Sequence, residues 1–192
     1  MAVHRHGESF CVSQLSLFEQ VLGANYMDLP AAVQRFHRLK GRTVLHGWVE
    51  THAPESFVAR CLAFSLGAPR STSSGPIRFE LDSGPTEETW TRHFPTRTMT
   101  SRMRRVTGQV EESLGSARLT FNLSVVEGKL NMRLTKMRFF GVSCPNWLLP
   151  QVVAQEMGVG DQLHFNISAA LPFVGTVASY RGHLDVRSKE PT

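Results

Sequence analysis

The stretch that decides the fold is RLTFNLSVVEGKLNMRLTKMRFF, residues 118–140. Its first half alternates apolar and polar side chains, as a strand with one buried face does. The apolar positions of that half share one face: Leu119, Phe121, Leu123 and Val125. The dipeptide Glu127–Gly128 then predicts a tight turn into a returning strand. The stretch is therefore a β-hairpin.

The returning strand changes phase partway along. Two apolar sets lie on opposite faces: first Leu130 and Leu134, then Met137 and Phe139. Such a switch predicts a β-bulge near Thr135 to Lys136. A bulge bends its strand, so this hairpin favours a curled sheet.

The same period of two runs from Ile77 almost to the end of the chain. A further strand is expected at Thr43 to Thr51, which is rich in β-formers. About ten strands in successive hairpins favour closure, because closure removes exposed edges. The sequence predicts a mainly β, lipocalin-like antiparallel meander curled into a barrel or half-barrel. The other strands are expected at residues 77–82, 87–94, 98–106, 108–114, 151–157, 161–170 and 174–186.

Helix signals precede this region. Ser16 to Gly23 carries the capping-box pattern Ser16-x-x-Glu19 and ends in a glycine. Pro30 to Lys40 begins with a proline suited to a first turn. A crossover helix is expected from Glu55 to Leu66, where an apolar stripe ends before Gly67. Two N-terminal helices and one crossover helix thus accompany the sheet.

Length and composition favour one domain over residues 1–192, with an ordered core at about 15–186 and a loose tail at 187–192. No run of about 18 apolar residues exists, and MAVHRHGESF lacks the apolar stretch of a secretory signal. We therefore expect a cytoplasmic location. Cys11, Cys61 and Cys144 form no CxxC pair and are interpreted as reduced thiols.

The net charge of +5 favours anionic partners. One tight basic cluster exists, Arg102, Arg104 and Arg105, without the interleaved aromatics of a nucleic-acid surface. The sequence predicts no nucleic-acid partner and leaves the oligomeric state open. It contains no phosphate loop, GxSxG elbow, HExxH or calcium loop, so no cofactor or metal is expected.

The most suggestive motif is Trp90-Thr91-Arg92-His93-Phe94. Its alternation puts the Arg92 guanidinium on one face with two aromatic rings. If that face is interior, Arg92 needs an acid or a ligand anion as its partner. The alternative is a structural arginine that stacks on aromatics or pairs with an internal glutamate. Arg102 on the next strand has the same two interpretations, and its face is left open.

Acid–base candidates are Glu156, His37 and Tyr180. Glu156 shares the phase of apolar neighbours, so it is either a general acid or base or the partner of Arg92 or Arg102. His37 is placed at a barrel mouth as an acid–base group or a satisfied core residue. Tyr180 and Arg181 face opposite ways, so one of them reaches the interior. Trp147, in the rigid loop between Pro145 and Pro150, is a lid, a partner contact or a plug.

The chain resembles a bacterial family of unknown function that occurs alone or fused to the C-terminus of saccharopine-dehydrogenase-like NAD(P)-binding proteins. The resemblance runs from Leu17 to Val186 and lends no established catalytic residue. It implies small-molecule metabolism and an NAD(P)-binding oxidoreductase as a possible partner. Two departures, Ser116 for proline and Gly160-Asp161 for Asp-Gly, affect no candidate. The motifs that carry it are LPAAVQRFH (29–37), WTRHF (90–94), SR (101–102), GSARLTF (115–121), GVSCPNWLLP (141–150), GDQLHFNI (160–167) and LPFVGTVASYRGHL (171–184).

The resemblance also implies that nine positions coincide with the family's pattern: His37, Trp90, Arg92, Arg102, Pro145, Trp147, Glu156, Tyr180 and Arg181. Three hypotheses follow. The first is a barrel that binds a small amphipathic or acidic molecule, with an apolar lining of Trp90, Met99, Phe121 and Phe165. Its ligand-binding candidates are Trp90, Arg92, Arg102, Trp147 and Arg181. The second is a cofactor-independent isomerase or cyclase that uses Glu156, His37 or Tyr180. The third is a protein-interaction module with Trp147 as its contact.

Overall fold

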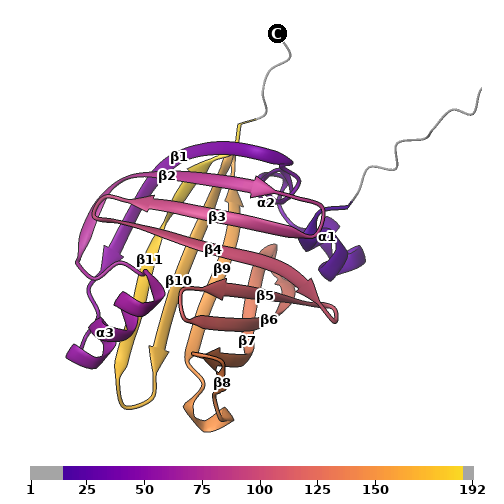
Figure 1. The fold of residues 1–192 in the computed structure, drawn as a ribbon. Helices are drawn as coiled ribbons and strands as arrows, with labels where there is room; N and C mark the ends of the chain where they lie inside the picture. The colour runs from indigo at the N-terminus through magenta and orange to yellow at the C-terminus, as the bar shows by residue number, and fades with distance from the viewer. Residues whose placement is uncertain (1–14, 188–192) are drawn as a thin grey trace, which may run out of the picture.

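The computed structural model describes residues 15–187 and consists mainly of β-strands (Figure 1). All strands pair antiparallel in one sheet of 11, in the order β6-β5-β4-β3-β2-β1-β11-β10-β9-β7-β8. An added β6–β7 pairing closes the sheet into a barrel. The strands are β1 (Gly41–His52), β2 (Ser73–Ser83), β3 (Glu87–Phe94), β4 (Arg97–Val106), β5 (Gln109–Leu114), β6 (Ala117–Val126), β7 (Lys129–Phe139), β8 (Val142–Ser143), β9 (Gln151–Val159), β10 (Gln162–Leu171) and β11 (Gly175–Asp185).

Closure confirms the predicted antiparallel barrel. Among the described strands, the short β8 pairs with β7 alone, so β8 is not part of the closed barrel wall. The hairpin at residues 118–140 is β6 and β7. Its turn has φ of 52° at Glu127 and 69° at Gly128, two consecutive left-handed residues as a tight hairpin turn requires.

The predicted bulge is present in β7. Thr120 pairs with Lys136 and Phe121 pairs with Leu134, so Thr135 has no partner residue in the register. The extra residue reverses the phase of β7, which explains why the apolar side chains of its two halves face opposite ways in the sequence pattern. Both sets consequently point into the barrel.

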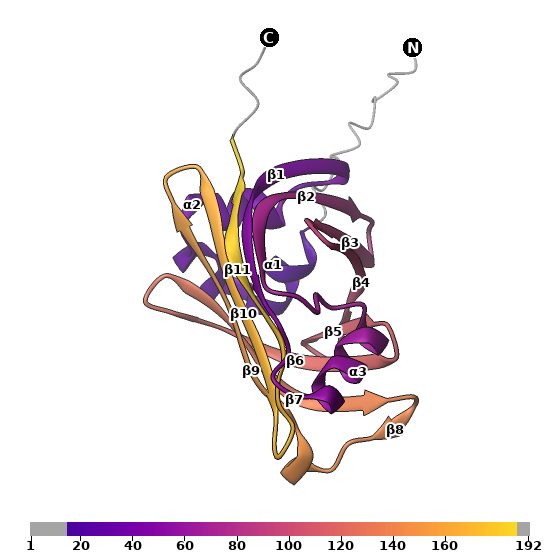
Figure 2. The ribbon, with the colours of Figure 1, turned by 90° about the vertical axis from the view of Figure 1, so that its left-hand side faces the viewer.

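Helices cover the two ends of the barrel (Figure 2). One end holds α1 (Leu17–Leu22), the 3-10 helix η1 (Gly23–Asp28) and α2 (Ala31–His37). The predicted capping box is present, since Ser16 Oγ accepts from the Glu19 N–H and Glu19 Oε2 accepts from the Ser16 N–H. The other end carries α3 (Phe57–Leu66), in the connection between the neighbouring strands β1 and β2, and η2 (Asn146–Leu148) after β8.

The core fills the barrel interior from the helix-plugged end. Phe18 of α1 and Phe36 of α2 are at most 1% exposed and pack against Trp90 of β3. Strand β3 alternates fully, with Glu88, Trp90, Arg92 and Phe94 all buried. The sequence pattern placed Trp90, Arg92 and Phe94 on one face of this strand, and that face is the interior one.

One seam of the barrel is short. The register of β7 and β9 has two pairs, Leu130 with Glu156 and Asn131 with Gln155. From there towards α3 the two strands diverge, as Figure 2 shows. The barrel wall is thus complete near α2 and splayed near α3.

Candidate functional site

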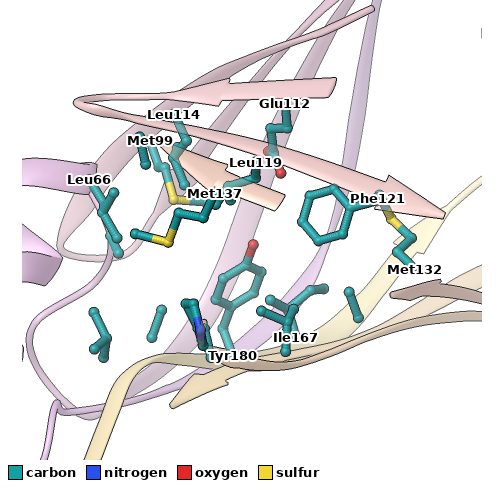
Figure 3. Close-up of a pocket in the computed structure, with 18 of the residues that line it drawn as sticks. Leu66, Met99, Glu112, Leu114, Leu119, Phe121, Met132, Met137, Ile167 and Tyr180 are labelled. Atoms are coloured by element: carbon teal, nitrogen blue, oxygen red, sulfur yellow. The ribbon is translucent and has the colours of Figure 1, made fainter. Parts of the chain in front are cut away.

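A cavity of about 130 Å³ lies inside the barrel, in the half nearer α3. Its wall is mostly apolar and rich in methionine, a flexible side chain that adapts to irregular spaces. Figure 3 shows these side chains converging from opposite strands. The methionines and phenylalanines of the wall are Met99, Met103, Met132, Met137, Phe121 and Phe139.

Polar side chains form a layer on the side of the cavity that faces the plugged end. Arg92, Glu156 and Tyr180 line both the cavity and a second hollow of about 30 Å³ behind it. Glu112 of β5 completes the layer from the opposite wall. Figure 3 shows its carboxylate and the Tyr180 phenol oxygen pointing into the cavity. Polar groups therefore meet an apolar space in the middle of the barrel.

Arg92 is the central cation of this layer. Arg92 is 8% exposed, and its Nη1 donates a hydrogen bond to Ser101 Oγ at 3.0 Å. Nη2 lies 3.9 Å from Glu112 Oε1, which balances its charge but is too long for a hydrogen bond. The guanidinium carbon also lies 5.2 Å from the centre of the Trp90 ring. Arg92 is therefore buried, with Glu112 as its acid.

Tyr180 contributes a hydroxyl that stays protonated. Burial raises the pKa of its phenol above the ordinary value, and the negative charges of Glu112 and Glu156 act in the same direction. The positive charge of Arg92 acts in the opposite direction and lowers the pKa of Tyr180. At neutral pH, Tyr180 thus offers the cavity an O–H that both donates and accepts.

Behind the layer, His37 and Glu156 form a buried pair. His37 Nε2 lies 2.7 Å from Glu156 Oε2, and the two side chains are 0% and 8% exposed. The imidazole stacks on Phe18 at 3.8 Å between ring centres. Its Nδ1 is buried without a hydrogen-bond partner among the described residues. Helix α2 therefore places the imidazole of His37 against the carboxylate of Glu156, which lines the cavity.

A second carboxylate, Glu88, lies in the same aromatic surroundings. It accepts a hydrogen bond from Trp90 Nε1 at 3.0 Å. Burial raises the pKa of Glu88, while the His37 charge and the Trp90 hydrogen bond lower it less strongly. Glu88 does not line the cavity, so its role is to satisfy the Trp90 indole.

The structure separates the predicted site residues into two groups. Trp90, Arg92, Glu156 and Tyr180 line the cavity, as do Met99 and Phe121, and His37 stands behind Glu156. Phe165 borders the smaller hollow instead. Glu156 meets His37, so the alternative that made Glu156 the partner of Arg92 or Arg102 is wrong. That contact spans 119 positions of chain, which no local pattern reveals.

Arg102, Arg181 and Trp147 do not enter the cavity, which corrects their assignment as ligand-binding residues. Arg102 is exposed because it alternates with the inward Met99, Ser101 and Met103. Arg181 follows the inward Tyr180 and pairs outside with Glu50, Nε to Oε2, at 2.8 Å.

Trp147 is 71% exposed, so it neither plugs nor lines the barrel. Its loop follows the edge strand β8, and only the end of the loop, Pro150, lines the cavity among the described residues.

The sequence interpretation missed Glu112 and Glu88. Both carry the signal that singled out Glu156, an acid in phase with apolar neighbours: Val110 and Leu114 flank Glu112, and Trp90 follows Glu88. The converging methionines had no such signal, because their strands are far apart in sequence.

Over residues 15–187, no group of three or more His, Cys, Asp or Glu side chains is arranged to hold a metal ion. Within the same residues, every helix is too short or too polar to cross a membrane.

The comparisons with known proteins give a similar solved structure and a family. The crystal structure of Rv2717c from M. tuberculosis is similar over 83% of this chain and 99% of that one, with a TM-score of 0.44 and 12% sequence identity. The comparison with curated proteins finds no significant match. A family model matches residues 29–184, which include α2, β1 to β10, nearly all of β11 and the residues of the polar layer. The chain therefore belongs to the family described as a domain of unknown function (DUF4166).

Proposed function

We propose that this protein is a cytoplasmic carrier that binds one small amphipathic or acidic molecule in the barrel cavity. The polar group of the ligand lies against Arg92, Glu112 and Tyr180, and its apolar body lies among the methionines. The cavity volume of about 130 Å³ is close to the engineered cavity of about 150 Å³ that holds benzene. A benzene-sized ligand fits without rearrangement, and larger ones require the wall to move.

The observation that carries this proposal is the unused donor capacity of Arg92 beside an apolar space. A guanidinium has five N–H donors. Within residues 15–187, the Arg92 guanidinium makes one hydrogen bond, to Ser101, and one longer contact, to Glu112. The donors that remain suit an oxygen of a ligand. Because Glu112 balances the charge, a neutral group that accepts from Arg92 and donates to Glu112 fits best, such as a hydroxyl or a protonated carboxyl group.

The resemblance to proteins fused with saccharopine-dehydrogenase-like oxidoreductases supports a metabolite as the ligand. An NAD(P)-binding oxidoreductase is accordingly the proposed protein partner. It would produce or consume the molecule that the barrel holds.

The test uses benzene, phenol and benzoate as probes of one size and different polarity. Isothermal titration and thermal shifts of the full chain should rank phenol above benzene, because the hydroxyl group meets Arg92 and Glu112. The double variant Arg92→Met/Glu112→Gln should lower the ratio of phenol affinity to benzene affinity by about tenfold, equivalent to about 1.4 kcal/mol. Changing both residues avoids leaving an unpaired buried carboxylate.

Arg102→Met is the matched control, since it makes the same substitution on the outer face of the neighbouring strand. It should bind all probes as the wild type does. Equal affinities of the wild type for benzene and phenol would contradict the proposed anchor. An equal loss of phenol affinity in the double variant and in Arg102→Met would contradict it as well. Native mass spectrometry of freshly purified protein then identifies the molecule retained from the cell.

A proton-transfer enzyme is the second candidate, favoured by the buried contact between His37 and Glu156. Glu156 lines the cavity and can take a proton from a carbon acid, while the Tyr180 hydroxyl donates a hydrogen bond to the carbonyl oxygen. Cyclohexanone in D₂O is a fitting probe. Deuterium incorporation at its α-carbons should require Glu156 and vanish in Glu156→Gln but persist in Arg102→Met. Absence of incorporation by the wild type would eliminate this candidate.

A further inference from the structure

The strongly exposed aromatic side chains gather at one end of the barrel. They belong to α3, to the turn after β7, to η2 and to the turn between β10 and β11. Figures 1 and 2 both place these elements at the end opposite α1 and α2. Over the described part of the chain, the Phe and Trp residues that are more than half exposed are Phe57, Phe64, Phe140, Trp147 and Phe173, which we call the aromatic rim.

The rings of the aromatic rim are largely exposed to solvent. Phe173 is 98% exposed and Phe57 81%, although each lies beside segments with partly buried apolar residues. Large apolar side chains gathered on one surface mark an interaction site. The rings come from separate segments of the chain that meet at this end of the barrel.

Arginines accompany the rim. The guanidinium carbons of Arg70 and Arg97 lie 5.0 and 5.3 Å from the centre of the Phe64 ring. Arg60 on α3 and Arg138 at the β8 end of β7 are exposed. The nearby acid, Glu55, accepts hydrogen bonds from Thr176 N and Oγ1. Positive charge is thus interleaved with the aromatic rings at this end.

We propose that the aromatic rim docks on the surface of an anionic phospholipid bilayer. The rings enter the interfacial region while the arginines meet lipid phosphates, the combination that holds peripheral proteins on membranes. The rim also surrounds the splayed part of the barrel: Leu62 and Leu66 of α3 and Pro150 after η2 line the cavity. Docking therefore brings the cavity to a source of apolar molecules. The docking itself does not depend on which ligand the cavity takes.

The test is co-sedimentation of the full chain with vesicles. Vesicles of phosphatidylcholine with about 30% phosphatidylglycerol should bind at least about tenfold more protein than phosphatidylcholine alone, because surface potential attracts the arginines. Binding should fall at about 1 M salt, where the Debye length shrinks to about 3 Å. The variant Phe57→Ser/Phe173→Ser should lose most binding to both vesicle types. Arg60→Gln/Arg70→Gln should lose the preference for the anionic ones.

Val44→Ser/Trp48→Ser is the matched control. Both residues are 47% exposed and lie on the outer face of β1, before the end of that strand that leads to α3. Circular dichroism and thermal melting verify that every variant is folded. The proposal fails if no vesicle binds the wild type, or if the rim variants bind as well as the control. Capture of a protein partner through the rim without vesicle binding would also overturn it. Phenol titration, run in parallel, tests the proposed function of the cavity, and its outcome is independent of vesicle binding.

Discussion

The two ends of the barrel use similar residues in opposite ways. At the plugged end, Phe18, Phe36 and Trp90 are at most 4% exposed and enclose the His37–Glu156 pair. At the rim end, Phe57 and Phe173 are more than 80% exposed beside a hollow interior. The first arrangement stabilises the fold, since buried aromatic surface dominates core energetics. The second leaves apolar surface available for ligand and partner. The difference teaches that aromatic content alone predicts neither core nor site.

The largest expected effect tests this contrast directly. Phe36→Ala at the plugged end should destabilise the protein by about 3–5 kcal/mol, because it removes a ring packed against Phe79 and Trp90. Phe173→Ala at the rim should change the free energy of unfolding by no more than about 0.5 kcal/mol. Urea denaturation of both variants gives the comparison. Equal losses would mean that the rim also belongs to the core.

The next effect concerns the polar pair of the plugged end. Glu156→Ala should cost about 1–3 kcal/mol, since His37 is left buried with neither ring nitrogen bonded. Glu156→Gln keeps an oxygen acceptor for Nε2 and should cost less. The exposed substitution Glu50→Gln serves as the control in the same denaturation series. A Glu156→Ala protein as stable as the Glu50→Gln control would contradict a structural contribution of the pair.

A smaller effect of opposite sign is expected in the hollow half. Ala154→Leu places a larger side chain on the cavity wall and should stabilise the protein by about 0.5–2 kcal/mol. The same change should abolish phenol binding because it removes the space. Thermal unfolding and titration measure the two consequences. Destabilisation together with retained phenol binding would show that the wall cannot accept the side chain there.

A pH effect sharpens the description of the plugged end. Burial raises the pKa of Glu88 above its ordinary value of 4.5, so the folded protein holds this proton to higher pH than the unfolded chain. Stability from this group is present below about pH 4 and declines as pH rises through the folded pKa. Glu88→Gln keeps an acceptor for Trp90. The melting temperature of Glu88→Gln should match that of the wild type below about pH 4. It should exceed that of the wild type at pH values above the folded pKa of Glu88. A constant difference between the two proteins at every pH would contradict this titration.

The smallest effect belongs to the outer wall between the two ends. Arg181→Gln removes an exposed pair with Glu50 and should cost about 0.2–1 kcal/mol, because water and salt screen such pairs. Probe affinities should equal those of the wild type. A loss of phenol binding comparable to that of the Arg92 variant would place Arg181 back among the ligand contacts.

The sequence by itself determined the antiparallel barrel, the bulge at Thr135 and the shared face of Trp90, Arg92 and Phe94. Each follows from the alternation of neighbouring side chains, a local property that every strand carries. Alternation also put Glu156 in phase with apolar neighbours, a signal that Glu112 carries as well, but it left open whether Tyr180 or Arg181 faces inward.

Only the tertiary structure decided what these side chains meet. Glu156 contacts His37 across 119 positions, and Arg92 faces Glu112 from another strand. The cavity and the aromatic rim likewise depend on how far β7 and β9 diverge and on where α3 and η2 lie. The physical reason is that pairing partners and empty volume are set by closure of the whole sheet, whereas the sequence pattern fixes only which face each residue takes.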